Sequence, residues 1–131
     1  MTKHALFSMT GIAVAMCSLT LLGLPLANQA DDVPLSFHAN PDVYKVLAEN
    51  DEMRVVLATW KPGQKDKSHS HPMAAVYTLK DCQARIATPD GNVKEVSNTA
   101  GTARINPAVK SHTFENTGKT ECQQVLVERK K

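Results

Sequence analysis

The sequence lacks a marked excess of either charge and has no cluster of unaccompanied basic side chains. Its 131 residues include 15 lysines and arginines against 13 aspartates and glutamates, for a net charge of +2 at pH 7. The lysines of segment 61–67 are accompanied by Asp66, so this segment is predicted to be a solvated loop and not a phosphate-binding patch. These features argue against binding to nucleic acid.

A convincing helical period is also missing from the chain after residue 31. Apolar and polar residues alternate there over short runs, and turn residues such as Pro89-Asp90-Gly91-Asn92 separate the runs. The strand-like runs are residues 43–47, 53–60, 74–79, 82–88, 93–96, 103–105, 112–114 and 123–127. Many short strands at regular spacing indicate a sandwich or barrel, and about a hundred residues suffice for one small barrel but not for two domains. We therefore predict an all-β fold, with a single antiparallel β-barrel over residues 31–131.

Residues 1–30 have the composition of a secretory signal peptide. Lys3 comes before an apolar run at residues 5–26, small residues follow up to Ala30, and the next two residues are acidic. This order predicts a signal helix that is cleaved after Ala30. The alternative is a retained membrane anchor, but glycine and proline interrupt the run, which barely reaches the ~20 residues that span a bilayer. We expect a periplasmic or secreted protein with no stable membrane association after cleavage.

Two of the three cysteines, Cys82 and Cys122, would remain after cleavage, in a compartment that is oxidising. Cleavage would remove one basic residue, Lys3, and no acidic one, which leaves a net charge of +1. A bridge between the two cysteines would close a loop of about 40 residues and stabilise the fold by roughly 3–4 kcal/mol. Two buried free thiols are the alternative, because the sequence does not show whether the two Cα atoms come close enough to bond.

Three histidines have the spacing of ligands to one metal ion. His69 and His71 are one residue apart, and alternate residues of a strand point to the same face of a sheet. His112 belongs to a later strand, so it can provide the third of three nitrogen ligands on one face of a metal ion. We predict that these imidazoles bind a divalent metal ion. Fe2+ is favoured, and Mn2+, Ni2+, Zn2+ or Cu2+ would also accept imidazole ligands.

The segments around these histidines resemble the two sequence motifs of the cupin superfamily. The matching residues are Gly63, His69 and His71 in the first motif, and Gly101, Pro107, His112 and Asn116 in the second. Val109 stands where the second motif usually has another glycine. The resemblance extends from about Met53 to Val127. It implies a small barrel of the jelly-roll type, with a divalent metal held inside by the motif histidines.

The first motif lacks its usual glutamate ligand. No carboxylate occurs in residues 72–79, and neither Asp81, in a predicted turn, nor Glu115, out of phase with His112, is a natural substitute. Three neutral imidazoles would leave the charge of a divalent ion uncompensated, so the site should favour small anionic ligands. No general base is evident. Tyr77 is a candidate acid or hydrogen-bond donor if it faces the cavity, although an aromatic residue in mid-strand is more often core.

Two functions of different classes follow from these features. The first is an exported Fe(II)-type dioxygenase acting on a small bidentate anion such as a thiol or a diketone, which the resemblance to three-histidine cupins implies. The second is a non-catalytic module that binds a metal or a small ligand. The apolar run at residues 125–127 predicts an open sheet edge near the end of the chain, and therefore a homodimer as one option.

Overall fold

The computed structural model describes residues 32–130, which form nine strands and one short helix. In chain order these are α1 (Ser36–Ala39), β1 (Tyr44–Glu49), β2 (Met53–Trp60), β3 (His69–His71), β4 (Ala74–Lys80), β5 (Cys82–Ala87), β6 (Val93–Asn98), β7 (Ala103–Asn106), β8 (Val109–Asn116) and β9 (Cys122–Arg129). The predicted signal peptide, residues 1–30, lies outside the described residues. Within residues 32–130 there is no helix with the length and hydropathy needed to cross a membrane.

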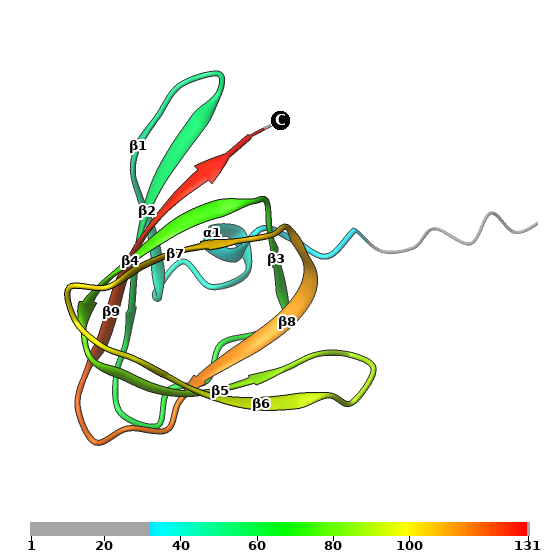
Figure 1. The fold of residues 1–131 in the computed structure, drawn as a ribbon. Helices are drawn as coiled ribbons and strands as arrows, with labels where there is room; N and C mark the ends of the chain where they lie inside the picture. Colours follow the sequence, from blue (N-terminus) through cyan, green and yellow to red (C-terminus); the bar gives the residue numbers. More distant parts are fainter. Residues whose placement is uncertain (1–31, 131) are drawn as a thin grey trace, which may run out of the picture.

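The strands form two antiparallel sheets that face each other as a jelly roll (Figure 1). One sheet has the strand order β1-β2-β9-β4-β7 and the other has the order β3-β8-β5-β6. The all-β prediction is confirmed, but the predicted closed barrel is not, because the ladder of hydrogen bonds is interrupted between the sheets. The turn after β6 carries the chain across to the other sheet, so that β7 pairs with β4 and not with β6.

Alternation along the strands creates the core between the sheets. In β2 the side chains of Val56, Ala58 and Trp60 point inward and are at most 2% exposed, while the residues between them are only partly buried. Trp60 stacks on Phe114 of the opposite sheet, with ring centroids 4.2 Å apart. Side chains therefore alternate between the interior and the outer face along β2, as the geometry of a strand requires.

A disulfide joins Cys82 of β5 to Cys122 of β9, with Cα atoms 4.8 Å apart. Both residues are buried, and their strands belong to different sheets. Of the two alternatives that the sequence leaves open, the structure therefore contains the bridge, which connects the two layers covalently.

The expectation of an open edge at residues 125–127 is wrong. These residues belong to β9, which lies in the middle of its sheet between β2 and β4. Val125, for example, has Leu57 as its partner on one side and Tyr77 on the other. The prediction of a homodimer loses this basis, because the last strand in sequence is not the last strand of the sheet.

Candidate metal centre

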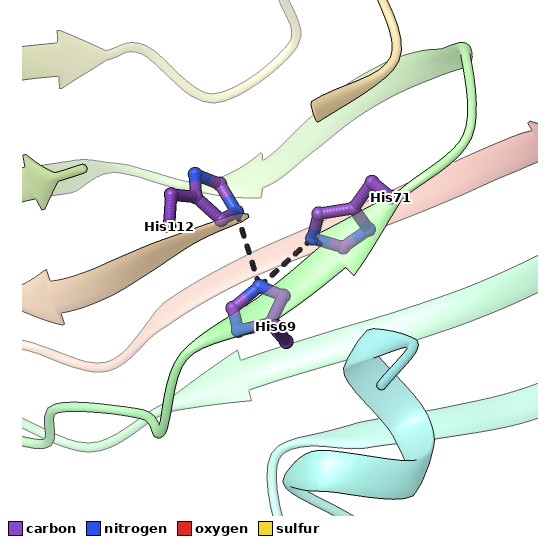
Figure 2. Close-up of side chains that lie close together, drawn as sticks. All are labelled: His69, His71 and His112. Carbon is purple, nitrogen blue, oxygen red and sulfur yellow. Dashed lines mark hydrogen bonds between the residues drawn. The ribbon is translucent and has the colours of Figure 1, made fainter. Parts of the chain in front are cut away.

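The structure brings His69, His71 and His112 together on the inside of the jelly roll. The first two lie on β3 and the third lies on β8, which pairs with β3 so that His69 is directly opposite His112. Figure 2 shows the three rings pointing toward one another. The Nε2 atom of His69 lies 3.0 Å from that of His71 and 3.1 Å from that of His112. One ligand nitrogen from each ring lies within 4.8 Å of the others.

This spacing fits a divalent ion bound in common. Two imidazole nitrogens in adjacent octahedral positions, at bonds of about 2.1 Å, would be about 3.0 Å apart. The distances from His69 to the other two rings agree with that value. Imidazole accepts several divalent metals, so the geometry supports a metal ion without selecting one.

Hydrogen bonds on the outer side of two rings leave their Nε2 atoms free to coordinate. The Nδ1 atom of His69 lies 2.8 Å from the carbonyl oxygen of Lys67, and Nδ1 of His71 lies 2.9 Å from Oε1 of Glu128. Carbonyl and carboxylate oxygens accept hydrogen bonds, so each Nδ1 carries the proton and donates. The lone pairs of both Nε2 atoms then face the centre, which is the tautomer that a metal requires.

Glu128 is a residue of the candidate site that the sequence did not reveal. It is fully buried on β9, directly opposite Ala74 in the ladder with β4, and so beside the stretch where the first motif lacks its carboxylate. Its Oε2 atom lies 3.5 Å from Nη1 of Arg54. The carboxylate is therefore present near the site, but it contacts His71 and not the centre. Its phase with the buried Leu126, two residues earlier, was the available clue.

Replacing Glu128 by glutamine is expected to lower the affinity for a divalent metal by about tenfold to a hundredfold. The amide oxygen can still accept the bond from His71, but the negative charge that makes the imidazole a stronger donor is lost. Competition titration with a chromogenic chelator measures the change. The matched control is Glu121→Gln, because Glu121 is an exposed glutamate paired with Lys80. Equal affinities in the two variants would contradict the role of Glu128.

The predicted solvated loop at 61–67 is present and its three lysines are exposed, but Asp66 within it is buried. Asp66 is 5% exposed and accepts hydrogen bonds from the Tyr44 hydroxyl, the indole N–H of Trp60 and the backbone N–H of Phe114. Its Oδ1 atom lies 3.7 Å from Nδ1 of His69. Burial raises the pKa of Asp66 and lowers that of His69. Nearby lysines suggested exposure, whereas folding turns this side chain into the core behind the histidines.

Of the two tyrosines, Tyr44 and not Tyr77 lies at the site. The Tyr44 hydroxyl is 3.1 Å from Nε2 of His69, and the residue is 2% exposed. Tyr77 is 46% exposed on the outer face of β4, because Val76 and Thr78 on either side of it point inward. Tyr77 therefore does not face the cavity. Burial, together with the carboxylate of Asp66, raises the pKa of Tyr44 well above its usual value, so its hydroxyl serves as a hydrogen-bond donor.

Burial also lowers the pKa of His112 to about 3, with a further contribution from the two neighbouring rings. The unfolded chain binds a proton at His112 near pH 6.5. Between these two values the unfolded state holds more protons, so His112 makes the metal-free protein less stable as the pH falls.

We expect this contribution to be about 1.4 kcal/mol per pH unit from pH 6.5 downward. Urea unfolding of the metal-free protein, with a chelator present, measures it as the stability difference between the wild type and His112→Ala at each pH. A His38→Ala variant, which changes an exposed histidine outside the site, controls for the loss of any histidine. A pH-independent difference between wild type and His112→Ala would contradict a neutral buried ring.

The two carboxylates that the sequence excluded as ligands do lie elsewhere. Asp81 accepts a hydrogen bond from the backbone N–H of Ala100, and Glu115 lies 3.5 Å from a guanidinium nitrogen of Arg85, in contact with solvent. Both assignments are confirmed.

A cavity of about 60 Å³ opens beside two of the histidines. His71 and His112 line one part of it, and Val76, Phe114 and Leu126 form apolar walls. At 10–15 Å³ for each water-sized site, this is space for roughly four to six water molecules. The cavity can therefore admit only a small ligand to the side of the histidines that faces it.

No protein-family model matches the sequence, and no curated protein matches it. Solved structures do share its fold. A cupin domain from Bordetella pertussis is similar over 68% of this chain and 93% of its own, with a TM-score of 0.63 and 23% identity. A Klebsiella pneumoniae protein with a double-stranded β-helix domain is similar over 66% and 75%, with a TM-score of 0.54 and 25% identity. The described part of this chain has the cupin fold, with three histidines grouped in its interior as a candidate metal site.

Proposed function

We propose that this protein is an exported metal-binding cupin, in which His69, His71 and His112 hold one divalent ion and present it to a small anionic ligand. The observation that carries the proposal is the convergence of the three ring nitrogens, with separations of 3.0 and 3.1 Å from His69, at the wall of a small cavity. Three buried imidazole nitrogens whose lone pairs face one another lower the stability of the folded state, unless a metal ion or protons lie between them.

The residues of this chain would hold the ligand rings in place and limit the amount of water beside the ion. Glu128 and the carbonyl of Lys67 hold two rings in the required tautomer, and the Tyr44 hydroxyl stays protonated beside His69. The apolar walls limit the number of waters in the cavity. A bound divalent ion would supply Lewis acidity and, if it is redox-active, the capacity to activate dioxygen.

We propose that the protein catalyses the reaction of an Fe(II)-type dioxygenase, with a small anion of the thiol or diketone class as its substrate. Three protein ligands leave coordination positions open for a bidentate substrate. The cupin fold also occurs in an enzyme: a polyketide cyclase from Streptomyces resistomycificus is similar over 67% of this chain and 64% of its own, with a TM-score of 0.51 and 20% identity. That likeness concerns the fold alone.

The second candidate function is a non-catalytic metal- or small-ligand-binding module. It is favoured by the cavity lining, which among the described residues contains no aspartate or glutamate. The tyrosine in the lining, Tyr44, stays protonated and donates a hydrogen bond to Asp66. Without a side chain free to move a proton, the cavity is suited to holding a ligand.

The disulfide supports the proposed export. Disulfides persist in secreted and periplasmic proteins and are rare where thiols are kept reduced. The bridge between Cys82 and Cys122 is therefore consistent with cleavage of a signal peptide after Ala30 and with an oxidising destination.

Metal analysis of the mature protein, purified without a histidine tag, tests the proposal. We expect close to one divalent ion per chain. If the ion is iron and the protein consumes dioxygen with one of a panel of thiols and β-diketones, the dioxygenase is supported, whereas tightly bound zinc without turnover supports the binding module. A protein that takes up no divalent ion after dialysis against iron, manganese, nickel, zinc and copper salts would overturn the metal site and the dioxygenase, and would leave only a small-ligand-binding module without metal.

A further inference from the structure

Arg104 is a partly buried cation in the wall of the cavity that His71 and His112 also line. It lies on β7 with its backbone opposite Val76 of β4, and it lines the same cavity as His71 and His112. Burial lowers its pKa, yet an arginine side chain remains protonated in proteins. The cavity therefore has a permanent positive charge of its own.

This charge has no carboxylate partner within residues 32–130, since no ion pair there includes Arg104. Its hydrogen bonds are long: one to Oγ1 of Thr78 at 3.5 Å and one to Oε1 of Gln124 at 3.3 Å. A guanidinium has five N–H donors, so most of them remain available. A partly buried charge without a counterion costs free energy, which an anionic ligand would offset.

Two other arginines differ from Arg104 because they do form ion pairs with glutamates. Arg54 lies 3.0 Å from Glu49 and 3.5 Å from Glu128, and Arg85 lies between two glutamates on the outside of the fold. Arg104 is thus the arginine that faces the cavity and lacks such a partner among the described residues.

The hydrogen-bond partners of Arg104 and of His71 lie at different positions along one strand ladder beside the cavity. Its partners Thr78 and Gln124 are opposite each other in the ladder between β4 and β9, while Glu128, which contacts His71, is opposite Ala74 in the same ladder. Four residues of strand separate these positions, or about 13 Å of backbone. Val76 and Leu126 form a ladder pair between them, so the middle of the cavity is apolar.

We propose that Arg104 is an anion-binding subsite, and that the ligand is a short linear molecule with a metal-chelating group at one end and a carboxylate at the other, joined by a body of a few carbons. A planar guanidinium suits a carboxylate because it can donate two parallel hydrogen bonds to it. The chelating end of this ligand rests on the proposed function, whereas the carboxylate end rests on Arg104 alone.

The test compares dicarboxylates from malonate to glutarate with the monocarboxylates of the same carbon number, titrated into the Co2+-loaded protein and followed by the cobalt absorption bands. For the best-fitting length we expect the wild type to bind the dicarboxylate about tenfold or more tightly than its monocarboxylate. Arg104→Met should reduce this preference to within about twofold and leave the affinity for Co2+ unchanged, since the thioether keeps the apolar stem but not the charge. An undiminished preference in Arg104→Met would overturn the proposal.

Two further variants and one further measurement separate the outcomes. Arg85→Met removes an arginine outside the cavity and should keep the preference for the dicarboxylate. Arg104→Lys retains the charge but not the planar pair of donors, so it should keep part of that preference. This second variant also provides a test if Arg104→Met folds poorly. The same acids are also titrated calorimetrically into the metal-free protein. Binding there that depends on Arg104, in a protein that takes up no Co2+, would sustain the anion subsite while the metal proposal fails. Binding that is independent of Arg104 in both forms would overturn the subsite.

Discussion

Replacing His112 by alanine is expected to abolish stoichiometric metal binding and to leave the fold in place. The change removes one of three nitrogen ligands, and the ring lies on β8 at the cavity wall. It is outside the cluster of apolar side chains that forms the core. Because loss of a residue that only orients a ligand typically costs ten- to a hundredfold in affinity, loss of a ligand itself should exceed about a hundredfold.

Metal content by mass spectrometry and a chelator competition titration measure the effect, and circular dichroism checks the fold. His38→Ala, a change at an exposed histidine, is the matched control and should bind metal as the wild type does. His69 is a less informative target, because it is fully buried against Tyr44 and Asp66 and its removal would leave a cavity beside these buried polar groups. A His112→Ala variant that retains one tightly bound ion would contradict the three-histidine site.

The largest expected effect on stability comes from breaking the disulfide. Cys82 and Cys122 are 40 residues apart, and closing a loop of that length lowers the entropy of the unfolded chain by an amount equal to about 4 kcal/mol. Domains of this size are usually stable by only about 5–15 kcal/mol. The bridge therefore accounts for a large part of the total, and the double variant Cys82→Ala/Cys122→Ala should unfold at a much lower urea concentration.

The single variants provide the control for this measurement. Either substitution breaks the same bond, so each should lose nearly as much stability as the double variant, and the losses should not add. Unfolding of the wild type under reducing conditions separates the bond from the change in side-chain volume. Two reactive thiols in the denatured, unreduced chain without residues 1–30, which has only Cys82 and Cys122, would show that the bridge does not form.

The features that could be predicted from the sequence are those with a local pattern. Short runs of strand-forming residues identified the strand at 53–60, and the spacing of His69 and His71 placed both rings on one strand. The position of His112 followed from its place in the second motif. These predictions required no knowledge of which strands are neighbours.

The features that could not be predicted depend on strand order and register. Glu128 meets His71 across 57 positions of sequence, and this contact exists only because β9 is inserted between β2 and β4. The same insertion buries the run at 125–127 within the sheet. Tyr77 was a candidate because the sequence predicts a strand there but not which of its two faces is turned inward. A shift of the strand by one residue would exchange the two faces. The structure decides the question, because the neighbours of Tyr77 are buried.

β3, the strand with two of the three histidines, lies at the edge of its sheet. The first described residues shield the outer backbone groups of this strand from solvent. Beyond β8, its other neighbour is a single bridge between Leu35 and Ser70, where the N–H of Ser70 donates to the carbonyl of Pro34 at 2.9 Å. A mature chain that begins after Ala30 would retain this cover, whereas trimming past Leu35 would strip it and leave the outer backbone groups of β3 open to solvent or to another chain. The residue at which a processed chain would begin and the integrity of the histidine cluster are therefore physically connected.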